Sequence, residues 1–274
     1  MHPIINFGFI QMPSYGLVIL LGFIVAVPIA MTLAEKYDYH KLDILLSTIL
    51  AAVGMIVFAK IIYIISLIPE LIEFHDYYSS HLNSLFFLMF NGYVFYGGLI
   101  GALLGFALYA KWNNSSVLKL LNIVVPVVPL VHAFGRIGCF LGGCCYGIPY
   151  HGFGAVRFPK NDFVGDVLGS VDRFPVQLLE SALNFLLFLL LYFIARKKRF
   201  DGMLLGLYLI IYPIERFFLE FLRGDAIRGK FFGISTSQWI SLMLIPIGIF
   251  LLVKKGNFKT KIMQEKNNEP SLDD

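Results

Sequence analysis

The stretch Tyr15–Leu33 reads YGLVILLGFIVAVPIAMTL and contains no charged residue. An α-helix needs about 20 mainly apolar residues to cross a hydrocarbon core roughly 30 Å thick. The stretch therefore predicts a transmembrane helix. Because no basic segment precedes it and no small-residue cleavage pattern follows it, we interpret it as a retained span rather than a signal peptide.

Similar apolar segments recur along the whole chain. Of the 274 residues, 58% are hydrophobic and 15% are charged, whereas soluble domains are about half apolar and about a quarter charged. The ~10-residue alternation of membrane β-strands is absent from the sequence. We predict an all-α membrane protein with about seven transmembrane helices, at Tyr15–Leu33, Leu42–Ile68, Tyr93–Trp112, Val117–Leu141, Pro175–Ala195, Met203–Leu222 and Ser237–Val253.

Basic residues in the loops predict the orientation, because they gather on the cytoplasmic side of membrane proteins. If the spans number seven, residues 36–41, 111–119, 196–199 and 254–266 fall on one side. We predict an outer N-terminus, a cytoplasmic C-terminus, one polytopic domain over residues 1–256 and a disordered polar tail over 257–274. The net charge of +4 fits this pattern, so we expect the lipid bilayer and no nucleic acid as a partner.

The sixth apolar segment carries charged residues on one face. Tyr212, Arg216, Glu220 and Arg223 are spaced four, four and three apart, which aligns them along a helix. A charge at the bilayer centre costs at least ~2.5–3.5 kcal/mol, so such residues usually face a protein interior, a cavity or a pathway. The structural alternative is an ion ladder in which Arg216 and Glu220 neutralise each other.

Segments four and five add polar residues at the same predicted outer face. His132 and Arg136 lie one helical turn apart, and Gln177, Glu180 and Asn184 share a face. A single histidine in a span is more often a packing partner than a catalyst. The guanidinium of arginine, however, offers fork-like donors that suit phosphate. We therefore expect a pocket for a lipid with an anionic phosphate head.

Segment three enters from that same predicted side through a glycine-rich stretch, residues 92–101. Within it, Gly97 and Gly98 follow Tyr96 directly. Glycines permit tight helix packing or the approach of a ligand to the backbone. We expect this stretch to line the pocket.

The three cysteines, Cys139, Cys144 and Cys145, follow Arg136 closely. Their spacing matches no zinc-binding pattern, and adjacent cysteines rarely pair because the geometry is strained. We predict packed or free thiols, with no metal ion and no cofactor. A disulfide between Cys139 and one of the pair is the alternative.

Together, these motifs resemble the prolipoprotein diacylglyceryl transferases of bacterial inner membranes. The resemblance runs from about Tyr15 to Val253 and rests on several motifs in order: Tyr15-Gly16-Leu17, Gly97–Gly101, Gly135–Gly147, Pro175–Glu180 and Tyr212–Arg223. It implies seven transmembrane helices with the N-terminus outside. It also implies that a diacylglyceryl group moves from phosphatidylglycerol to the lipobox cysteine thiol of a prolipoprotein, with release of glycerol phosphate.

The resemblance also implies roles for individual residues. Arg136 matches the essential arginine of the family, and Gln177 and Glu180 match its Pro-x-Gln-Leu-x-Glu run. The arginines are expected to bind the donor phosphate, and the glutamates to hold the arginines in place. The expected catalytic residues are Arg136, Arg216, His132, Tyr96 and Glu220; the expected substrate-binding residues are Gly97, Gly98, Gln177, Glu180, Tyr212 and Arg223.

The chain departs from the family pattern at a few positions. Tyr96 stands where much of the family has a histidine, and Cys139 and Cys144 stand where it has asparagine and glutamate; Lys60 replaces an arginine. The base that deprotonates the acceptor thiol is therefore either His132 or Tyr96. We favour His132, because the reference pKa of histidine, about 6.5, is nearer neutrality than that of tyrosine, about 10.

Two alternatives use the same residues differently. A paralogue would use phosphatidylglycerol to modify a glycan or another lipid instead of a lipoprotein. A transporter or scramblase would line a path for an anionic substrate with the buried charges. The inverted repeats common in transporters are not evident in the sequence, which disfavours the second alternative.

Overall fold

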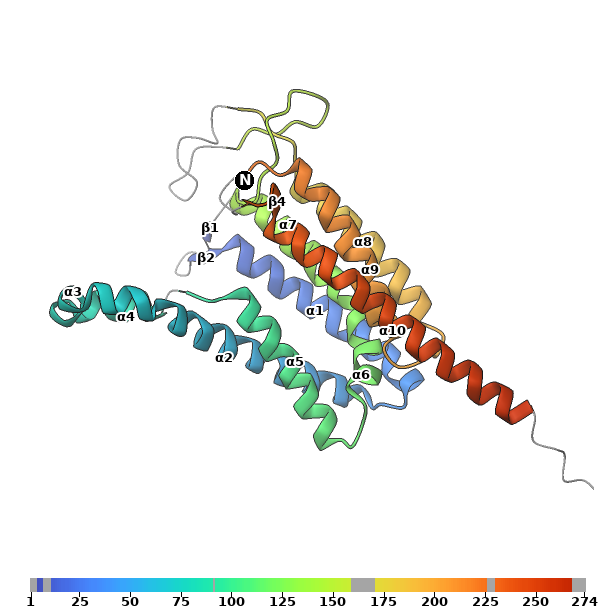
Figure 1. Ribbon diagram of the computed structural model, residues 1–274. Coiled ribbons are helices and arrows are strands. Elements are labelled where there is room, and N and C mark those ends of the chain that lie inside the picture. Colours follow the sequence, from blue (N-terminus) through green and yellow to red (C-terminus); the bar gives the residue numbers. More distant parts are fainter. Residues whose placement is uncertain (1–3, 7–10, 91, 159–170, 226–229, 268–274) are drawn as a thin grey trace, which may run out of the picture. The chain divides into compact units, whose positions relative to one another are not determined.

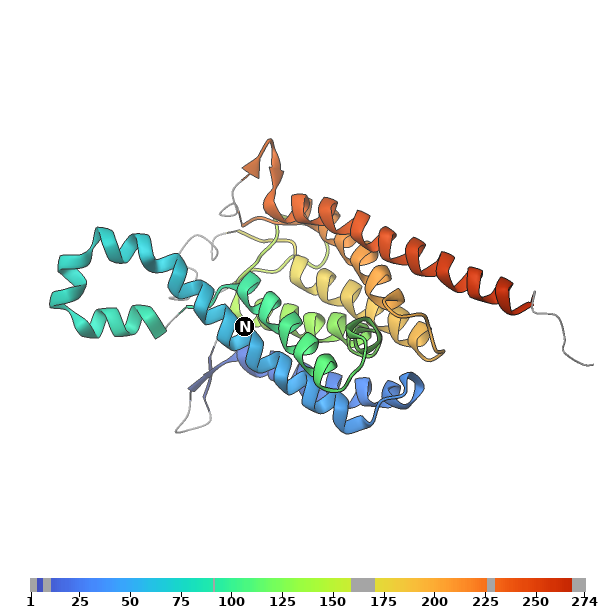
Figure 2. The ribbon, with the colours of Figure 1, turned by 60° about the horizontal axis from the view of Figure 1, so that its bottom comes forward.

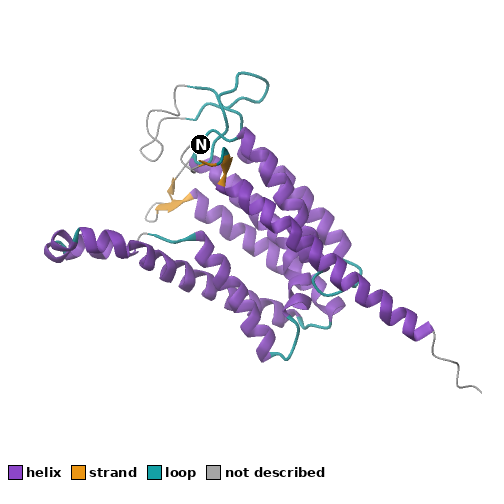
Figure 3. Cartoon of the chain, viewed as in Figure 1, coloured by secondary structure: helices purple, strands orange, loops and turns teal. Residues whose placement is uncertain are grey.

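Helices make up nearly all of the computed structural model, which describes residues 4–6, 11–90, 92–158, 171–225 and 230–267 (Figures 1 and 3). The chain divides into two units, residues 1–38 with 121–274 and residues 39–120, and each unit is described by itself. Helix α6 (Val117–Val124) crosses the boundary between them. The prediction of a single domain over residues 1–256 stays a prediction.

The first unit consists mainly of helices that lie side by side. Helix α7 packs against α1 and α8, α8 packs against α9, and α9 packs against α10 (Figure 1). Two short antiparallel ribbons, β1 with β2 and β3 with β4, accompany them. The elements are β1 (Ile4–Asn6), β2 (Gln11–Pro13), α1 (Ser14–Ala34), η1 (Glu35–Tyr37), η2 (Val125–Val127), α7 (Val128–Gly142), α8 (Val176–Ala195), α9 (Met203–Leu219), η3 (Glu220–Leu222), β3 (Lys230–Phe231), β4 (Ile234–Ser235) and α10 (Thr236–Asn267).

Glycines bring the helices of this unit close together. A Cβ atom on Gly248 of α10 would lie 2.7 Å from the backbone oxygen of Gly206 in α9. A Cβ atom on Gly22 of α1 would lie 2.9 Å from the Cβ of Phe134 in α7. Membrane helices pack through small residues in this way, because lipid supplies no hydrophobic force to press them together.

Helix α7 ends in a turn that shapes the chain after it. Gly143 adopts a left-handed conformation with φ 77°, and the backbone N–H of Cys144 bonds to the carbonyl of Cys139 at 3.1 Å. Glycine is the residue that most readily adopts this conformation at a helix end. The turn folds the chain back over the last turn of α7.

Backbone hydrogen bonds then join three segments that are distant in sequence. The N–H of Ile148 bonds to the carbonyl of Leu222 at 3.0 Å, and the N–H of Gly224 bonds to that of Tyr146 at 3.0 Å. The N–H of Phe174, just before α8, bonds to the carbonyl of Ile148 at 3.0 Å. The C-terminal ends of α7 and α9 and the N-terminal end of α8 are thereby held together.

The second unit is built on α2 (Lys41–Glu73) and α5 (Phe95–Trp112), which pack along each other. Helices α3 (His75–Ser80) and α4 (Leu82–Phe90) connect them (Figure 2). A Cβ atom on Gly97 would lie 2.7 Å from the oxygen of Phe58, and one on Gly105 would lie 2.6 Å from that of Leu50. The glycines of segment three therefore permit a close contact between α2 and α5.

Within the described residues, six helical segments are long and apolar enough to cross a membrane: 14–37, 41–73, 95–112, 117–142, 176–195 and 236–254. The remaining predicted span forms α9, 17 residues long, which continues directly into η3. The prediction of an all-α membrane protein is confirmed. Its orientation in the membrane stays a prediction.

The structure differs from the predicted spans after the second apolar segment. Helix α2 continues to Glu73, beyond the predicted end at Ile68, and the predicted loop that follows contains α3 and α4. Helix α10 continues to Asn267, and the prediction of a disordered tail over residues 257–274 stays a prediction. Residues 268–274 lie outside the described part of the chain.

Candidate functional site

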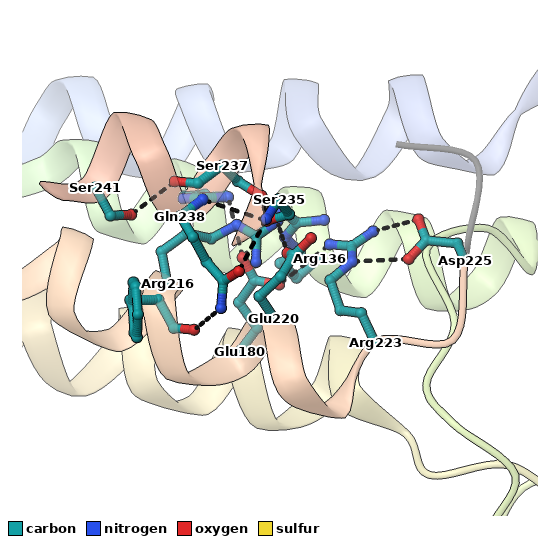
Figure 4. A network of polar contacts seen from close by, with 12 residues as sticks. Arg136, Glu180, Arg216, Glu220, Arg223, Asp225, Ser235, Ser237, Gln238 and Ser241 are labelled. Carbon is teal, nitrogen blue, oxygen red and sulfur yellow. Dashed lines mark hydrogen bonds and ion pairs between the residues drawn. The ribbon is translucent and has the colours of Figure 1, made fainter. Parts of the chain in front are cut away.

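Charged side chains from α7, α8 and the segment after α9 meet in the first unit (Figure 4). The carboxylate of Glu180, only 1% exposed, lies between the others. Its Oε1 is 2.9 Å from Arg136 Nη2 and 3.8 Å from His132 Nε2, and its Oε2 is 4.0 Å from Arg223 Nη1. One buried carboxylate thus faces two guanidinium groups and an imidazole, which is the convergence that the sequence predicted for segments four, five and six.

A second ion pair lies alongside, within segment six. Arg216 Nη2 is 2.6 Å from Glu220 Oε2, one helical turn further along. The same nitrogen donates a hydrogen bond to Ser237 Oγ at 3.1 Å. The ion pair of the structural alternative is therefore present, although Arg216 also bonds to α10.

Arg223 forms a two-pronged contact with Asp225. Its Nε lies 2.9 Å from Oδ1 and its Nη2 lies 2.7 Å from Oδ2. Such paired bonds hold a guanidinium in a defined orientation. Sequence reasoning missed Asp225, because it lies beyond the last helical turn and outside the four-residue spacing.

The start of α10 contributes a polar group that sequence reasoning also missed. The backbone N–H of Ser235 bonds to Gln238 Oε1 at 3.0 Å, and the N–H of Gln238 bonds to Ser235 Oγ at 3.3 Å. This reciprocal pair is a capping box. Its signal was present as Ser-x-x-Gln immediately before an apolar run. Gln238 Nε2 also bonds to the carbonyl of Phe217 at 3.3 Å, which joins α10 to α9.

Some guanidinium nitrogens in this cluster form no hydrogen bond with the described residues. Within the described part of the chain, Arg136 Nε, Arg216 Nη1 and Arg223 Nη1 are buried and have no hydrogen-bond partner. A buried donor without a partner costs about 1–3 kcal/mol. Nitrogens of this kind indicate a site for a ligand with several oxygen acceptors, and phosphate matches the geometry of arginine well.

Polar side chains of α8, among them the predicted site residue Gln177, bond to backbone carbonyls. Gln177, fully buried, donates from Nε2 to the carbonyl of Cys144 at 2.8 Å. Ser181 Oγ bonds to the carbonyl of Ala133 at 2.9 Å and so joins α8 to α7. Asn184 Nδ2 bonds to the carbonyl of Glu180 at 2.8 Å. These contacts position α8, and the predicted role of Gln177 in substrate binding stays a prediction.

The two candidate bases have different surroundings. The ring of His132 lies 5.2 Å from that of Tyr212, measured between centroids, and beside the Glu180 carboxylate. Tyr96, Gly97 and Gly98 belong to the second unit. Tyr96 is about half exposed there, whereas the two glycines are buried. The structure thus brings His132 and Tyr212 to the arginines, while the roles of Tyr96, Gly97 and Gly98 in the site stay predictions.

The three cysteine thiols lie together at the end of α7. The sulfurs of Cys139, Cys144 and Cys145 are all within 4.8 Å of one another, and Arg136 Nη1 is 4.0 Å from the Cys139 sulfur. Hydrogen bonds from Cys139 and Cys144 lower the pKa of the Cys145 thiol, and Arg223 acts in the same direction. The thiols predicted from the sequence as packed or free form one cluster.

Comparison with known proteins agrees with the resemblance in the sequence. The model of the prolipoprotein diacylglyceryl transferase family matches residues 3–254. The chain belongs to this family. A phosphatidylglycerol–prolipoprotein diacylglyceryl transferase of Clostridium tetani is 39% identical over 238 residues, covering 87% of this chain and 91% of the relative. A protein of that name numbered 2, from Clostridium perfringens, is 38% identical and covers 87% and 89%. One from Finegoldia magna is 33% identical and covers 88% and 90%.

Membership of the prolipoprotein diacylglyceryl transferase family confirms the resemblance inferred from the motifs. The match covers both units, from the first apolar segment to the last. The charged cluster around Glu180 therefore belongs to a transferase fold of the membrane.

Proposed function

We propose that this protein transfers a diacylglyceryl group from phosphatidylglycerol to the lipobox cysteine of prolipoproteins and releases glycerol phosphate. We place it in the bacterial cytoplasmic (inner) membrane, with its active site towards the extracytoplasmic face. One observation carries the proposal: in this member of the family, three arginines that pair with Glu180 and Glu220 keep buried guanidinium nitrogens that form no hydrogen bond with the described residues.

The arginines would act on the phosphate of the donor lipid. The nitrogens of Arg136, Arg216 and Arg223 that form no hydrogen bond with the described residues would donate to its oxygens. As the bond between glyceryl carbon and phosphate oxygen breaks, negative charge develops on that oxygen. Donors that are already oriented stabilise this charge without reorganisation. Glu180 and Glu220 hold the guanidinium groups in position through their ion pairs.

The acceptor thiol must lose its proton before it attacks, because the thiolate is the nucleophile. His132 is our first candidate for the proton acceptor. Its imidazole lies one turn from Arg136 and 3.8 Å from the carboxylate of Glu180, which would orient the ring. Tyr96 is the second candidate, as the sequence predicted.

The test is to express the chain in cells depleted of their own diacylglyceryl transferase and to follow a labelled prolipoprotein by gel shift and mass spectrometry. We expect the mass of a diacylglyceryl group on the lipobox cysteine. Arg136→Ala should abolish this gain. Arg157→Ala, which removes an exposed arginine away from the cluster, should leave it intact.

An unmodified prolipoprotein, in the presence of folded and inserted protein, would overturn the proposal. A diacylglyceryl group found on a glycan or on another lipid would instead establish the paralogue with a different acceptor. Transfer that continues at full rate with Arg136→Ala would remove Arg136 from the phosphate site.

A further inference from the structure

The cysteine cluster gathers every cysteine of the chain at one place. The sequence contains three cysteines, and their sulfurs all lie within 4.8 Å of one another. Cys139 is buried in α7, Cys145 is half-buried and Cys144 is exposed. The proposed phosphate site uses none of them. The cluster is therefore open on one side and closed on the other.

The backbone around the cluster is built to bring the thiols together. The turn at Gly143 places the N–H of Cys144 on the carbonyl of Cys139. Cys145 then adopts a left-handed conformation with φ 57°, which residues with a side chain rarely adopt. The buried amide of Gln177 holds the carbonyl of Cys144 at 2.8 Å.

Three converging thiols are a donor set for a soft metal ion. Thiolates select zinc, copper(I) or iron–sulfur centres over hard cations. Zinc–sulfur bonds are about 2.3 Å long, so tetrahedral zinc separates two sulfurs by about 3.8 Å. The observed limit of 4.8 Å is therefore within about 1 Å of that geometry. Structural zinc sites have four protein ligands, whereas catalytic sites have three and keep the fourth position open.

The neighbours of the cluster are compatible with a metal–thiolate centre. Arg136 Nη1 lies 4.0 Å from the Cys139 sulfur. Three thiolates with one Zn²⁺ carry a net charge of −1, which a nearby guanidinium offsets. The same arginine pairs with Glu180. The cluster and the proposed phosphate site are therefore adjacent.

We propose that Cys139, Cys144 and Cys145 bind a zinc ion, and that the acceptor cysteine thiol of the substrate occupies its fourth coordination position. This inference rests on the proposed function, because it concerns the acceptor of that reaction. It replaces the expectation from spacing that the cysteines bind no metal. Spacing in the sequence did not reveal the turn after α7.

The reaction then balances without an oxidant or reductant. A thiol coordinated to zinc is deprotonated outright, and its proton passes to solvent or to a nearby base. A sulfur lone pair attacks the glyceryl carbon and forms the C–S bond. The C–O bond to phosphate breaks, its electron pair stays on the phosphate oxygen, and glycerol phosphate leaves. The thioether product is neutral, so it binds zinc weakly and is released; the zinc ion keeps its charge.

The first measurement is the metal content of the full-length protein, purified in detergent with a reductant that does not bind metals and without chelators. We expect about one zinc per chain. Cys139→Ser, Cys144→Ser and Cys145→Ser should each lower it severalfold. Arg157 is not part of the cluster, so the Arg157→Ala variant should keep its zinc. Size-exclusion chromatography of each variant separates lost ligands from lost folding.

The second measurement uses unaltered protein with cobalt in place of zinc, so it does not depend on how the variants fold. Sulfur-to-cobalt charge-transfer bands report the thiolates, and the visible bands report the fourth ligand. A lipobox peptide with its cysteine should change the visible bands. The same peptide with serine at that position should leave them unchanged.

Several results would overturn the inference. The first is that all three serine variants retain their zinc. The second is a disulfide among the cysteines in the protein as isolated from the membrane. The third is that the visible bands do not change when the cysteine peptide is added. Full transfer by metal-free enzyme would also overturn it and leave the proposed function intact. Conversely, cobalt bands that respond to the peptide, with no diacylglyceryl transfer in zinc-loaded protein, would support the metal site and overturn the proposed function.

Discussion

Two regions that are unusual in sequence differ in how completely the structure accounts for them. The glycines of α5 fit closely against the backbone of α2, so packing within their own unit explains them. The arginines around Glu180 pair with carboxylates but retain buried nitrogens without partners in the described structure. The glycines thus have a packing role whatever else they contact, whereas buried donors without a hydrogen bond indicate a ligand.

Replacement of Arg136 should give the largest effect on activity. Arg136→Ala removes a donor to the departing phosphate, so we expect transfer to fall by on the order of 10²-fold or more, about 2.7 kcal/mol. Arg136→Lys keeps the positive charge but loses the paired donors of the guanidinium, so its rate of transfer should lie between those of the unaltered protein and Arg136→Ala. The measurement is the rate of lipoprotein modification per folded protein.

If Arg136 served only to neutralise the charge of Glu180, adding Glu180→Gln to Arg136→Ala in a double variant would restore activity. We expect no such rescue, because the phosphate would still lack its donor. Restoration would reduce the cluster to the structural ion ladder considered from the sequence.

Replacement of a glycine of α5 should affect stability. A Cβ atom on Gly105 would lie 2.6 Å from the oxygen of Leu50 in α2. Gly105→Ala must therefore separate the two helices, and we expect a loss of about 1–3 kcal/mol. Thermal unfolding in detergent measures it, with activity per folded protein as the second readout.

Gly16→Ala is the matched control, because a Cβ atom there would meet no atom of the described residues within 4 Å. It should leave the melting temperature unchanged or raise it slightly, since alanine favours helices over glycine. Equal destabilisation by both substitutions would contradict the explanation by packing.

The same contrast explains what the sequence could reveal. Spacing along one helix predicted that Arg216 and Glu220 would meet, because a four-residue interval fixes the geometry. The positive-inside rule placed Glu180 and Arg136 at one end, and they pair at 2.9 Å. Helical spacing could not predict that Arg223 would bind Asp225, because the helix ends before it.

The spacing of the cysteines in the sequence also could not predict that their thiols form a cluster. It depends on left-handed backbone at Gly143 and Cys145, which sequence spacing does not encode. Likewise, Tyr96 and the arginines belong to different units. Helices and pairs within one helix were therefore predictable, whereas contacts that depend on turns and on long-range packing were not.

The N-cap of α10 is a polar group whose hydrogen bonds are made within the fold. Ser235→Ala removes the side chain that accepts the N–H of Gln238. We expect a loss of about 1 kcal/mol, because an N-cap residue supplies a bond that the helix end otherwise lacks. The hydroxyl of Ser241 bonds back to the carbonyl of Ser237 within α10, so Ser241→Ala should change stability less. Equal melting temperatures for both variants would contradict the role of the cap.

The smallest effect should come from an ion pair that faces solvent, in contrast to those around Glu180. Arg157 Nε lies 2.7 Å from Asp172 Oδ1, and this hydrogen bond lowers the pKa of the Asp172 carboxyl. A lowered pKa in the folded state means that the pair stabilises the protein above the pKa of the unfolded state, about 3.9. The contribution disappears as the pH falls through the pKa of Asp172 in the folded state.

The small difference in melting temperature between the unaltered protein and Arg157→Ala should therefore be present at pH 7 and vanish at low pH. It should also shrink in high salt, which screens exposed charges. A difference that persists in acid would show that Arg157 stabilises the loop by packing rather than by charge.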